Sequence, residues 1–286
     1  MSQRLVGFDK ETGELLEDVV VLTKKQIANS KKRKEAQEQA AEFRRWHGKD
    51  NFIMYVFSEN CNLSDLTPQT ATRLIYLATW LEYDGEYLTV NKEHMTREQM
   101  EEIMLLKPTT FKSFLKEITE KGYLIKENKA YRINKEVFQK GEYTHKVSLV
   151  NERFVRVYIK YIRHLYELTP QSKHVHLGYI FQLIPYINCE YNVLCHNPLE
   201  KDPEKIIPMT VGEFCEAIGY DVSQASRLLD IYDKITFEVD GKNSYFCGYT
   251  GRKKQNNQDR RIIINPFIFF AGSDEHKVEV LKILFV

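Results

Sequence analysis

The chain has no long apolar run, no large excess of charge and no paired-cysteine motif. Because no apolar run approaches the roughly 20 residues that a membrane-spanning helix needs, we expect no membrane association. The first ten residues, MSQRLVGFDK, contain no apolar stretch of the signal-peptide kind, so we expect a cytoplasmic protein. The five cysteines are then expected to stay reduced.

Charge of neither sign dominates. The chain has 41 lysines and arginines and 40 aspartates and glutamates, which gives a net charge of +1. The sequence pI is about 7.6. This balance argues against a generally basic nucleic-acid binder, so any such function must come from local clusters of charge. With 286 residues, 43% of them hydrophobic, the chain is long enough for two globular domains of ordinary size.

What the chain does contain is an internal repeat of about 100 residues. The pattern of residues 52–81 recurs without a gap 102 residues later, and both copies contain Leu-Thr-Pro-Gln. A block over residues 95–115 returns 114 residues later, and one over residues 133–147 returns 131 residues later. Three collinear blocks with a growing offset indicate duplication followed by insertion. The offsets place 12 extra residues before the second copy's middle block and 17 after it.

Each copy predicts the order helix, helix, turn, helix and hairpin, which is the order of a winged helix. Apolar residues at helical spacing and helix-capping residues predict the elements. In the first copy these are helices over 70–82, 96–104 and 108–122 and a hairpin over 125–133. In the second copy they are helices over 177–184, 211–219 and 223–234 and a wing over 236–264, with the insertion around 251–261. Leu-Thr-Pro-Gln is typical of a helix start, with threonine as N-cap and proline in the first turn.

The predicted fold class is therefore α+β, with two tandem winged helices that arise from internal duplication. We predict three parts: an N-terminal arm over residues 1–51, a first winged helix over 52–148 and a second over 149–286. The arm is predicted to hold a hairpin within residues 5–22, followed by a basic helix to about residue 45. The hairpin is also a candidate edge for pairing with a partner.

The element order and the stretch Ile-Asn-Pro-Phe-Ile-Phe-Phe-Ala-Gly at residues 264–272 give the chain a family resemblance. Over residues 52–286 it resembles the tandem winged-helix replication initiators of plasmids and phages and the phage DNA-binding regulators related to them. The resemblance implies sequence-specific binding to an origin or operator. It also implies dimer formation, often through the first winged helix, and recruitment of host replication or transcription proteins. Winged helices also occur in repressors and protein-interaction modules.

The third helix of each copy is expected to carry the DNA contacts, because that helix of a helix-turn-helix enters the major groove. The contacts predicted in the first copy are Thr109, Thr110, Lys112, Ser113 and Lys116. Those predicted in the second copy are Ser223, Gln224, Ser226 and Arg227. Glutamine can pair with adenine and arginine with guanine, so we expect the second copy to read bases and the first to anchor phosphates. The alternative is that both sets form only a solvated helix face.

Two basic clusters outside these helices are also predicted to contact DNA. The wing insertion carries Arg252, Lys253, Lys254, Arg260 and Arg261, and the N-terminal arm carries Lys31, Lys32, Arg33 and Lys34. A wing is placed to meet the sugar-phosphate backbone or the minor groove. For the arm, a solvated connector helix is the alternative, because Glu35, Glu38 and Glu42 interleave with its later turns.

Several motif-like patterns are interpreted as structural. His174-Val175-His176 matches the histidine pattern of metal-dependent nickases, but the repeat aligns both histidines with a helix, where residues two apart diverge. Gly-Lys occurs twice without the Walker spacing, and no CxxC pair is present. We therefore expect no enzyme activity, no cofactor and no metal. The residues weighed for a zinc site are Cys189, Cys195, His196, Cys215 and Cys247.

Aromatic residues concentrate at the head of the second copy. Because their spacing is helical, we interpret them as core and inter-domain packing, with base stacking as the alternative. They are Phe154, Tyr158, Tyr161, Tyr166, Tyr179, Phe181 and Tyr186.

From the sequence we predict a non-enzymatic protein of phage or plasmid type that binds double-stranded DNA sequence-specifically and acts in replication initiation. A close alternative is a phage transcription regulator with the same fold and the same binding physics. A third hypothesis is a winged-helix protein-interaction module that binds a polymerase or a replisome component. The near-neutral net charge favours the third hypothesis, and the clustered wing charges disfavour it.

Overall fold

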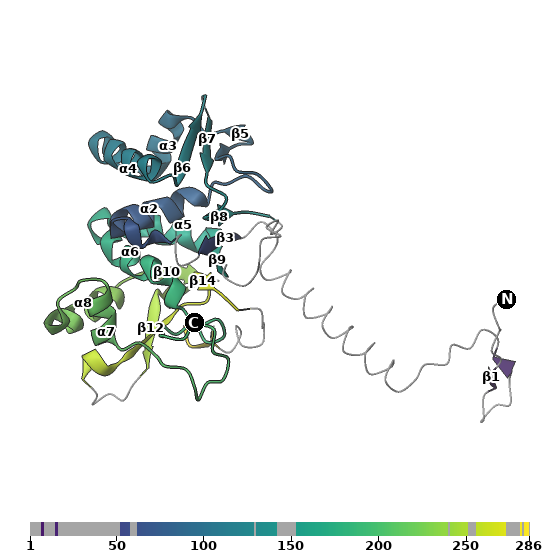
Figure 1. Ribbon diagram of the computed structural model, residues 1–286, viewed down its shortest axis with the longest axis vertical. Coiled ribbons are helices and arrows are strands. Elements are labelled where there is room, and N and C mark those ends of the chain that lie inside the picture. Colours follow the sequence, from purple (N-terminus) through teal and green to yellow (C-terminus); the bar gives the residue numbers. More distant parts are fainter. Residues whose placement is uncertain are drawn as a thin grey trace. The chain divides into compact units, whose positions relative to one another are not determined.

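The computed structural model mixes α-helices with short β-strands, so the predicted α+β class is confirmed (Figure 1). It describes residues 7–8, 15–16, 52–57, 62–128, 130–141, 153–239, 241–250, 256–272, 281 and 283–285. The chain divides into two compact units, residues 1–48 and 49–286. In the first unit, strand β1 (Gly7–Phe8) pairs antiparallel with β2 (Leu15–Leu16), within the span predicted to form a hairpin.

The remaining described elements belong to the unit over residues 49–286. In its first half these are β3 (Phe52–Phe57), α2 (Pro68–Ala78), β4 (Thr89–Val90), β5 (Glu93–His94), α3 (Arg97–Met104), α4 (Pro108–Glu120), β6 (Leu124–Glu127), β7 (Ala130–Ile133) and β8 (Phe138–Gln139). In its second half they are β9 (Arg153–Tyr158), α5 (Ile159–Leu168), α6 (His174–Gln182), α7 (Val211–Ala217), α8 (Ala225–Tyr232), β10 (Thr236–Val239), β11 (Lys242–Tyr245), β12 (Cys247–Thr250), β13 (Arg261–Ile264) and β14 (Phe269–Phe270). Short 3-10 helices cover Leu63–Asp65, Gln171–Lys173, Ile184–Tyr186, Val222–Gln224 and Asn257–Asp259.

Capping residues set several helix starts as the sequence predicted. Thr67 caps α2, and Pro68 is its first residue. Thr96 begins α3 with a capping box, in which its side chain accepts from the Gln99 N–H. Thr210 begins α7 with the same arrangement, 114 residues later. Each box satisfies backbone groups that the first turn of a helix leaves unpaired.

The second Leu-Thr-Pro-Gln stretch differs from the prediction. Thr169 lies at the C-terminal end of α5, and Pro170 leads into the 3-10 helix Gln171–Lys173 instead of starting an α-helix. The cause is α5 itself, a helix that the repeat pattern did not predict. Its buried residues Ile162, Leu165 and Tyr166 recur at helical spacing and carry the helix up to the threonine.

A four-stranded antiparallel sheet, in the order β14-β9-β3-β8, joins strands from both halves. Near the centre of the β3–β9 ladder, Met54 pairs with Arg156. The two residues are 102 positions apart, which is the offset of the first repeat block. The outer strands pair in corresponding registers. Tyr55 pairs with Phe138, and Val157 pairs with Phe269. Val157 lies 102 residues after Tyr55 and Phe269 lies 131 residues after Phe138, as the repeat offsets require. The registers of the sheet therefore match the offsets found in the sequence.

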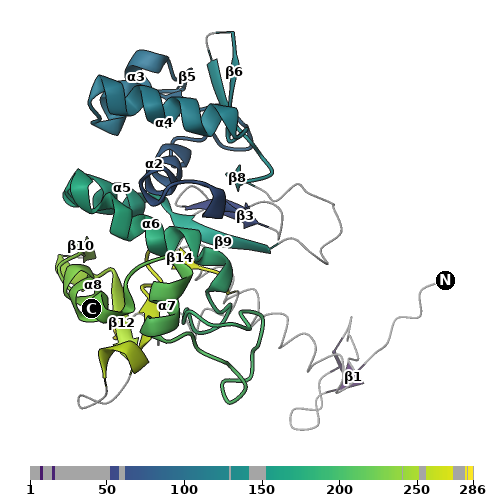
Figure 2. The same ribbon diagram turned by 60° about the vertical axis from the view of Figure 1, so that its left-hand side comes forward.

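Helices α2 and α6 pack closely against each other beside this sheet (Figure 2). The Thr72 hydroxyl donates to the His174 carbonyl oxygen over 2.8 Å, and these two residues are again 102 apart. At Gly178 the two backbones lie close together, because a Cβ atom there would lie 1.8 Å from the Pro68 carbonyl oxygen. One continuous cluster of buried apolar side chains extends from the first half into the second.

The second wing is more elaborate than predicted. Where the first half has one hairpin of β6 and β7, the second has two, β10 with β11 and β12 with β13. Phe246, between β11 and β12, and Cys247, the first residue of β12, are buried, so the chain returns to the core there instead of forming one long wing. Burial of these two side chains favours the extra strands, because a lengthened loop would expose them to water.

His174 is expected to make the fold less stable in mild acid. Burial lowers the pKa of its imidazole below the ordinary 6.5, because the charged form loses its hydration. The neutral ring keeps its Nε2 within 3.0 and 2.9 Å of the Tyr166 and Thr169 carbonyl oxygens, to which it donates. Burial lowers the pKa of His176 as well.

Below about pH 6.5 the unfolded chain binds a proton that the folded chain does not, so the free energy of unfolding falls as the pH drops toward the folded pKa. Urea unfolding at about pH 7.5 and about pH 5 measures this loss. The variant His174→Gln keeps an N–H donor without titrating, so it should lose less stability between the two pH values. Equal losses in variant and wild type would contradict the assignment to His174.

Candidate nucleic-acid interface

The N-terminal part of α4 presents the side chains predicted for the first half. Phe111, Phe114 and Ile118 are buried, which turns the opposite side of the helix outward. Thr109, Lys112, Ser113 and Lys116 are exposed, and Thr110 is half-buried. Lys116 lies 3.7 Å from Glu120 in a solvated pair, whereas Lys112 has no acidic partner among the described residues. Lys112 is therefore the cation of this face most available to a phosphate.

The face of α8 is built in the same way. Its residues Ala225, Leu228, Leu229 and Tyr232 are buried, and the Tyr232 hydroxyl donates to the His176 carbonyl oxygen over 2.9 Å. The residues predicted to contact DNA are all exposed: Ser223, Gln224, Ser226 and Arg227. The first two lie in the 3-10 helix before α8, because Asp221 accepts from the Ser223 N–H and tightens that turn.

The two exposed faces occupy corresponding positions of the repeat. Thr109 and Thr110 stand 114 residues before Ser223 and Gln224, and Lys112 and Ser113 stand 114 residues before Ser226 and Arg227. Within the unit over residues 49–286, α4 lies toward one end and α8 toward the other, with α2 and α6 between them (Figure 1, Figure 2). The unit thus offers two separate helix faces, not one continuous patch.

Only part of the predicted wing cluster lies within the described residues. The Arg260 guanidinium stacks over the Tyr249 ring at 4.6 Å, and Arg261 donates to the Asp259 carbonyl oxygen. Both arginines are half-buried against their own half, close to the start of α7. Arg252, Lys253 and Lys254 lie outside the described residues, as do Lys31, Lys32, Arg33 and Lys34 of the arm. Asn257 donates to the Ser226 hydroxyl over 3.0 Å, which places the end of the wing beside α8.

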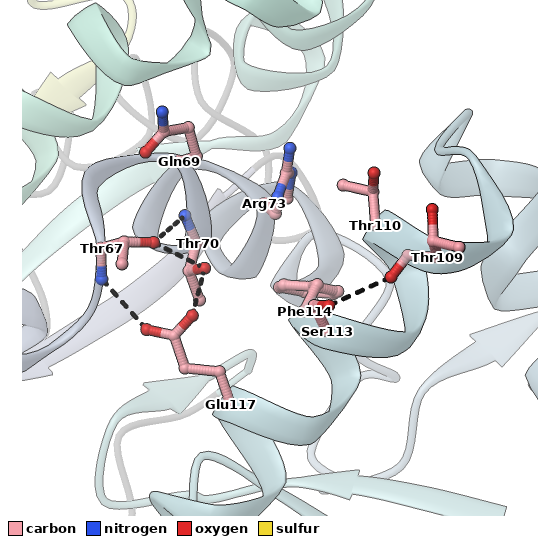
Figure 3. A pocket seen from close by; sticks show the side chains of 9 residues that line it. All are labelled: Thr67, Gln69, Thr70, Arg73, Thr109, Thr110, Ser113, Phe114 and Glu117. Carbon is pink, nitrogen blue, oxygen red and sulfur yellow. Dashed lines mark hydrogen bonds between the residues drawn. The ribbon is translucent and has the colours of Figure 1, made fainter.

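Sequence reasoning missed Arg73, which lies beside the face of α4. An open pocket of about 420 Å³ separates the start of α2 from the start of α4 (Figure 3). It is lined by Thr67, Gln69, Thr70, Arg73, Thr109, Thr110, Ser113, Phe114 and Glu117. The available signal was that Arg73 is the one charged residue of α2, at a position where the second copy has Val175.

A larger cavity of about 1210 Å³ opens where the start of α2 meets α7 and the segment before it. Three of its four charged side chains already have partners, Glu216 being the fourth. His196 Nε2 lies 3.4 Å from Glu213 Oε1, while Glu213 also accepts from the Thr210 N–H. Arg153 stacks over the Phe57 ring at 5.0 Å. The pocket beside α4 is therefore the better candidate to bind a charged ligand.

The residues weighed for metal chemistry take structural places. His174 and His176 lie on α6, and both are buried. Among the described residues, no group of three or more histidine, cysteine or acidic side chains is arranged to hold a metal ion. Burial raises the pKa of Cys215 to about 11 and that of Cys247 to about 12, which disfavours the reactive thiolate. The described helices include none with the length and apolar character required to cross a bilayer.

Comparisons with protein-family models, with curated proteins and with solved structures find no match to this chain.

Proposed function

We propose that the chain is a sequence-specific double-stranded DNA-binding protein that acts in replication initiation. The observation that carries the proposal is the pair of exposed faces on α4 and α8. Four corresponding positions of the repeat carry hydroxyl and cationic side chains in the first half and hydroxyl, amide and cationic side chains in the second, and all but the half-buried Thr110 are exposed. Outward polar residues at the start of the third helix are what a helix-turn-helix uses to reach base edges and phosphates.

The proposal includes the view that residues 52–148 and 149–286 are two copies of one winged-helix unit. Support comes from the shared registers of the central sheet and from the two capping boxes 114 residues apart. Further support comes from Asn134 and Asn265, 131 residues apart, whose side chains both accept from the N–H two residues ahead at 2.9 Å. The 17-residue insertion after the middle block would then supply the extra hairpin of the second copy.

Selection of bound duplexes from a random-sequence pool tests this function. The full chain should enrich one family of sequences, because a protein that reads bases loses about 1 to 3 kcal/mol for each mismatched pair. Recovery of bound DNA without any enriched sequence would contradict specific binding. Iterated sites within the enriched genomic region would favour an initiator, whereas a single palindrome over a promoter would favour the alternative of a transcription regulator.

The basic wing residues are expected to add binding that does not depend on sequence. Replacing Arg252, Lys253 and Lys254 with alanine should weaken binding to all duplexes. The slope of log affinity against log salt should fall in magnitude by up to about 2 to 3 units, since each lost phosphate contact releases about 0.9 fewer counterions. Titrations at several salt concentrations measure the slope, and an unchanged slope with full affinity would remove the wing from the interface.

A second candidate function is a protein-interaction module. It is favoured by two apolar side chains on the segment between α6 and α7, Leu199 and Ile207, which are 64% and 58% exposed. Exposed apolar side chains can form part of a protein-binding surface. A chain that enriches no DNA sequence but loses a replication partner when both residues become serine would support this function instead.

A further inference from the structure

We infer that the pocket between α2 and α4 binds a phosphodiester group of the DNA backbone, with Arg73 as its cation. The inference rests on the proposed function and assigns to it a residue outside the predicted recognition helices. Arg73 projects from α2 between Gln69 and Thr110, on the pocket side of the helix (Figure 3). A phosphate in this pocket would lie next to Thr109 and Thr110, at the start of the face predicted to contact DNA.

The guanidinium of Arg73 is held without a full set of partners. The side chain is half-buried, and its Nε atom is buried with no hydrogen-bond acceptor among the described residues. Burial lowers the pKa of Arg73, while the Tyr166 hydroxyl, to which the guanidinium is hydrogen-bonded, and the Glu117 carboxylate act in the opposite direction. A half-buried cation without a dedicated carboxylate partner is stabilised by an anion that enters from solvent.

Glu117 is the acidic side chain that lines the pocket, and its carboxylate already has hydrogen-bond donors and a lysine beside it. Its Oε1 accepts from the Thr67 N–H over 3.1 Å, and its Oε2 accepts from the Thr70 hydroxyl over 2.7 Å. The Lys121 ammonium lies 3.9 Å from Oε1. The carboxylate therefore ties the start of α2 to α4 and leaves the Arg73 side of the pocket to an anion.

Hydroxyl groups complete a lining that suits phosphate oxygens. Thr109 and Thr110 line the side of α4, while the Ser113 hydroxyl already donates to the Thr109 carbonyl oxygen over 3.1 Å. The second half places its cation differently, because Val175 stands where the first has Arg73 and Arg227 stands where the first has Ser113. The arginines at these corresponding positions are thus carried by different elements, α2 in the first half and α8 in the second.

Arg163 provides a matched control within the same unit. It is a similarly half-buried arginine, and burial lowers its pKa too. Its guanidinium contacts groups inside the protein, since it donates to the Thr79 hydroxyl and carbonyl oxygens, each over 3.0 Å, and stacks 3.7 Å from the Trp80 ring. Loss of Arg163 removes structural contacts without removing a ligand contact.

The test compares Arg73→Gln, Arg73→Lys and Arg163→Gln in the full chain, with a random 30-base-pair duplex titrated at several salt concentrations. Arg73→Gln should weaken binding about tenfold and lower the magnitude of the salt slope by about 0.9. Arg73→Lys should keep most of the slope, because it keeps the charge, and Arg163→Gln should lower the melting temperature but keep the slope. If Arg73→Gln does not fold, Thr110→Val removes a pocket hydroxyl without removing the cation and should weaken binding severalfold.

The possible outcomes separate the pocket from the proposed function. Wild-type binding to DNA with no change in slope in the Arg73 variants would overturn the pocket and leave the function standing. If the wild type binds no duplex, the function fails, and inorganic phosphate becomes the probe. Phosphate that raises the melting temperature of the wild type but not of Arg73→Gln would then support an anion site for a free phosphate, and no such rise would overturn the site.

Discussion

Replacing Gly178 with alanine is expected to lower the free energy of unfolding by about 3 kcal/mol or more. A glycine-to-alanine change inside a helix ordinarily stabilises it by about 0.5 to 1 kcal/mol, because alanine loses less conformational freedom. Here the added methyl would lie 1.8 Å from the Pro68 carbonyl oxygen and 2.3 Å from its carbonyl carbon. These are backbone atoms, so α2 and α6 must separate, and overpacking of this kind is costly.

Thermal and urea unfolding of Gly178→Ala measure this loss. For a folded unit of this size, about 3 kcal/mol corresponds to a melting temperature lower by roughly 6 to 12 °C. Thr119→Ala, at an exposed position of α4, is the control and should stay within about 0.5 kcal/mol of the wild type. A Gly178→Ala protein as stable as the wild type would show that the two helices do not meet at this glycine.

Gln224→Ala and Arg227→Ala are expected to weaken binding to the selected DNA sequence by about 1 to 3 kcal/mol each and to random DNA by much less. Both side chains are exposed at the start of α8 and have the donor and acceptor groups that read adenine and guanine. Ser226→Ala, on the same helix, should have a smaller effect, because its hydroxyl already accepts from Asn257.

Competition titrations with selected and random duplexes distinguish base reading from phosphate anchoring. Lys112→Ala, on the corresponding face of the first half, should lose affinity for both duplexes equally if it binds a phosphate. Equal losses on both duplexes for Gln224→Ala and Arg227→Ala would show that the second half does not read bases.

Much of the local structure of the described residues follows from the sequence. The starts of α2, α3 and α7 follow from the threonines that cap them, and the hairpin of β6 and β7 follows from its strand pattern and turn. The exposed faces of α4 and α8 follow from the spacing of their apolar residues. Such features depend on interactions between residues a few positions apart, which a single sequence displays directly.

The tertiary structure alone decided how the two halves meet. The pairing of β3 with β9 and the contact of α2 with α6 join residues 102 apart, and no local pattern specifies which faces come together. The division of the second wing into two hairpins, β10 with β11 and β12 with β13, and the position of Arg73 beside the start of α4 became visible only in the fold. Burial supplies the reason, because whether a side chain lies in the core or lines a pocket depends on surfaces contributed by distant parts of the chain.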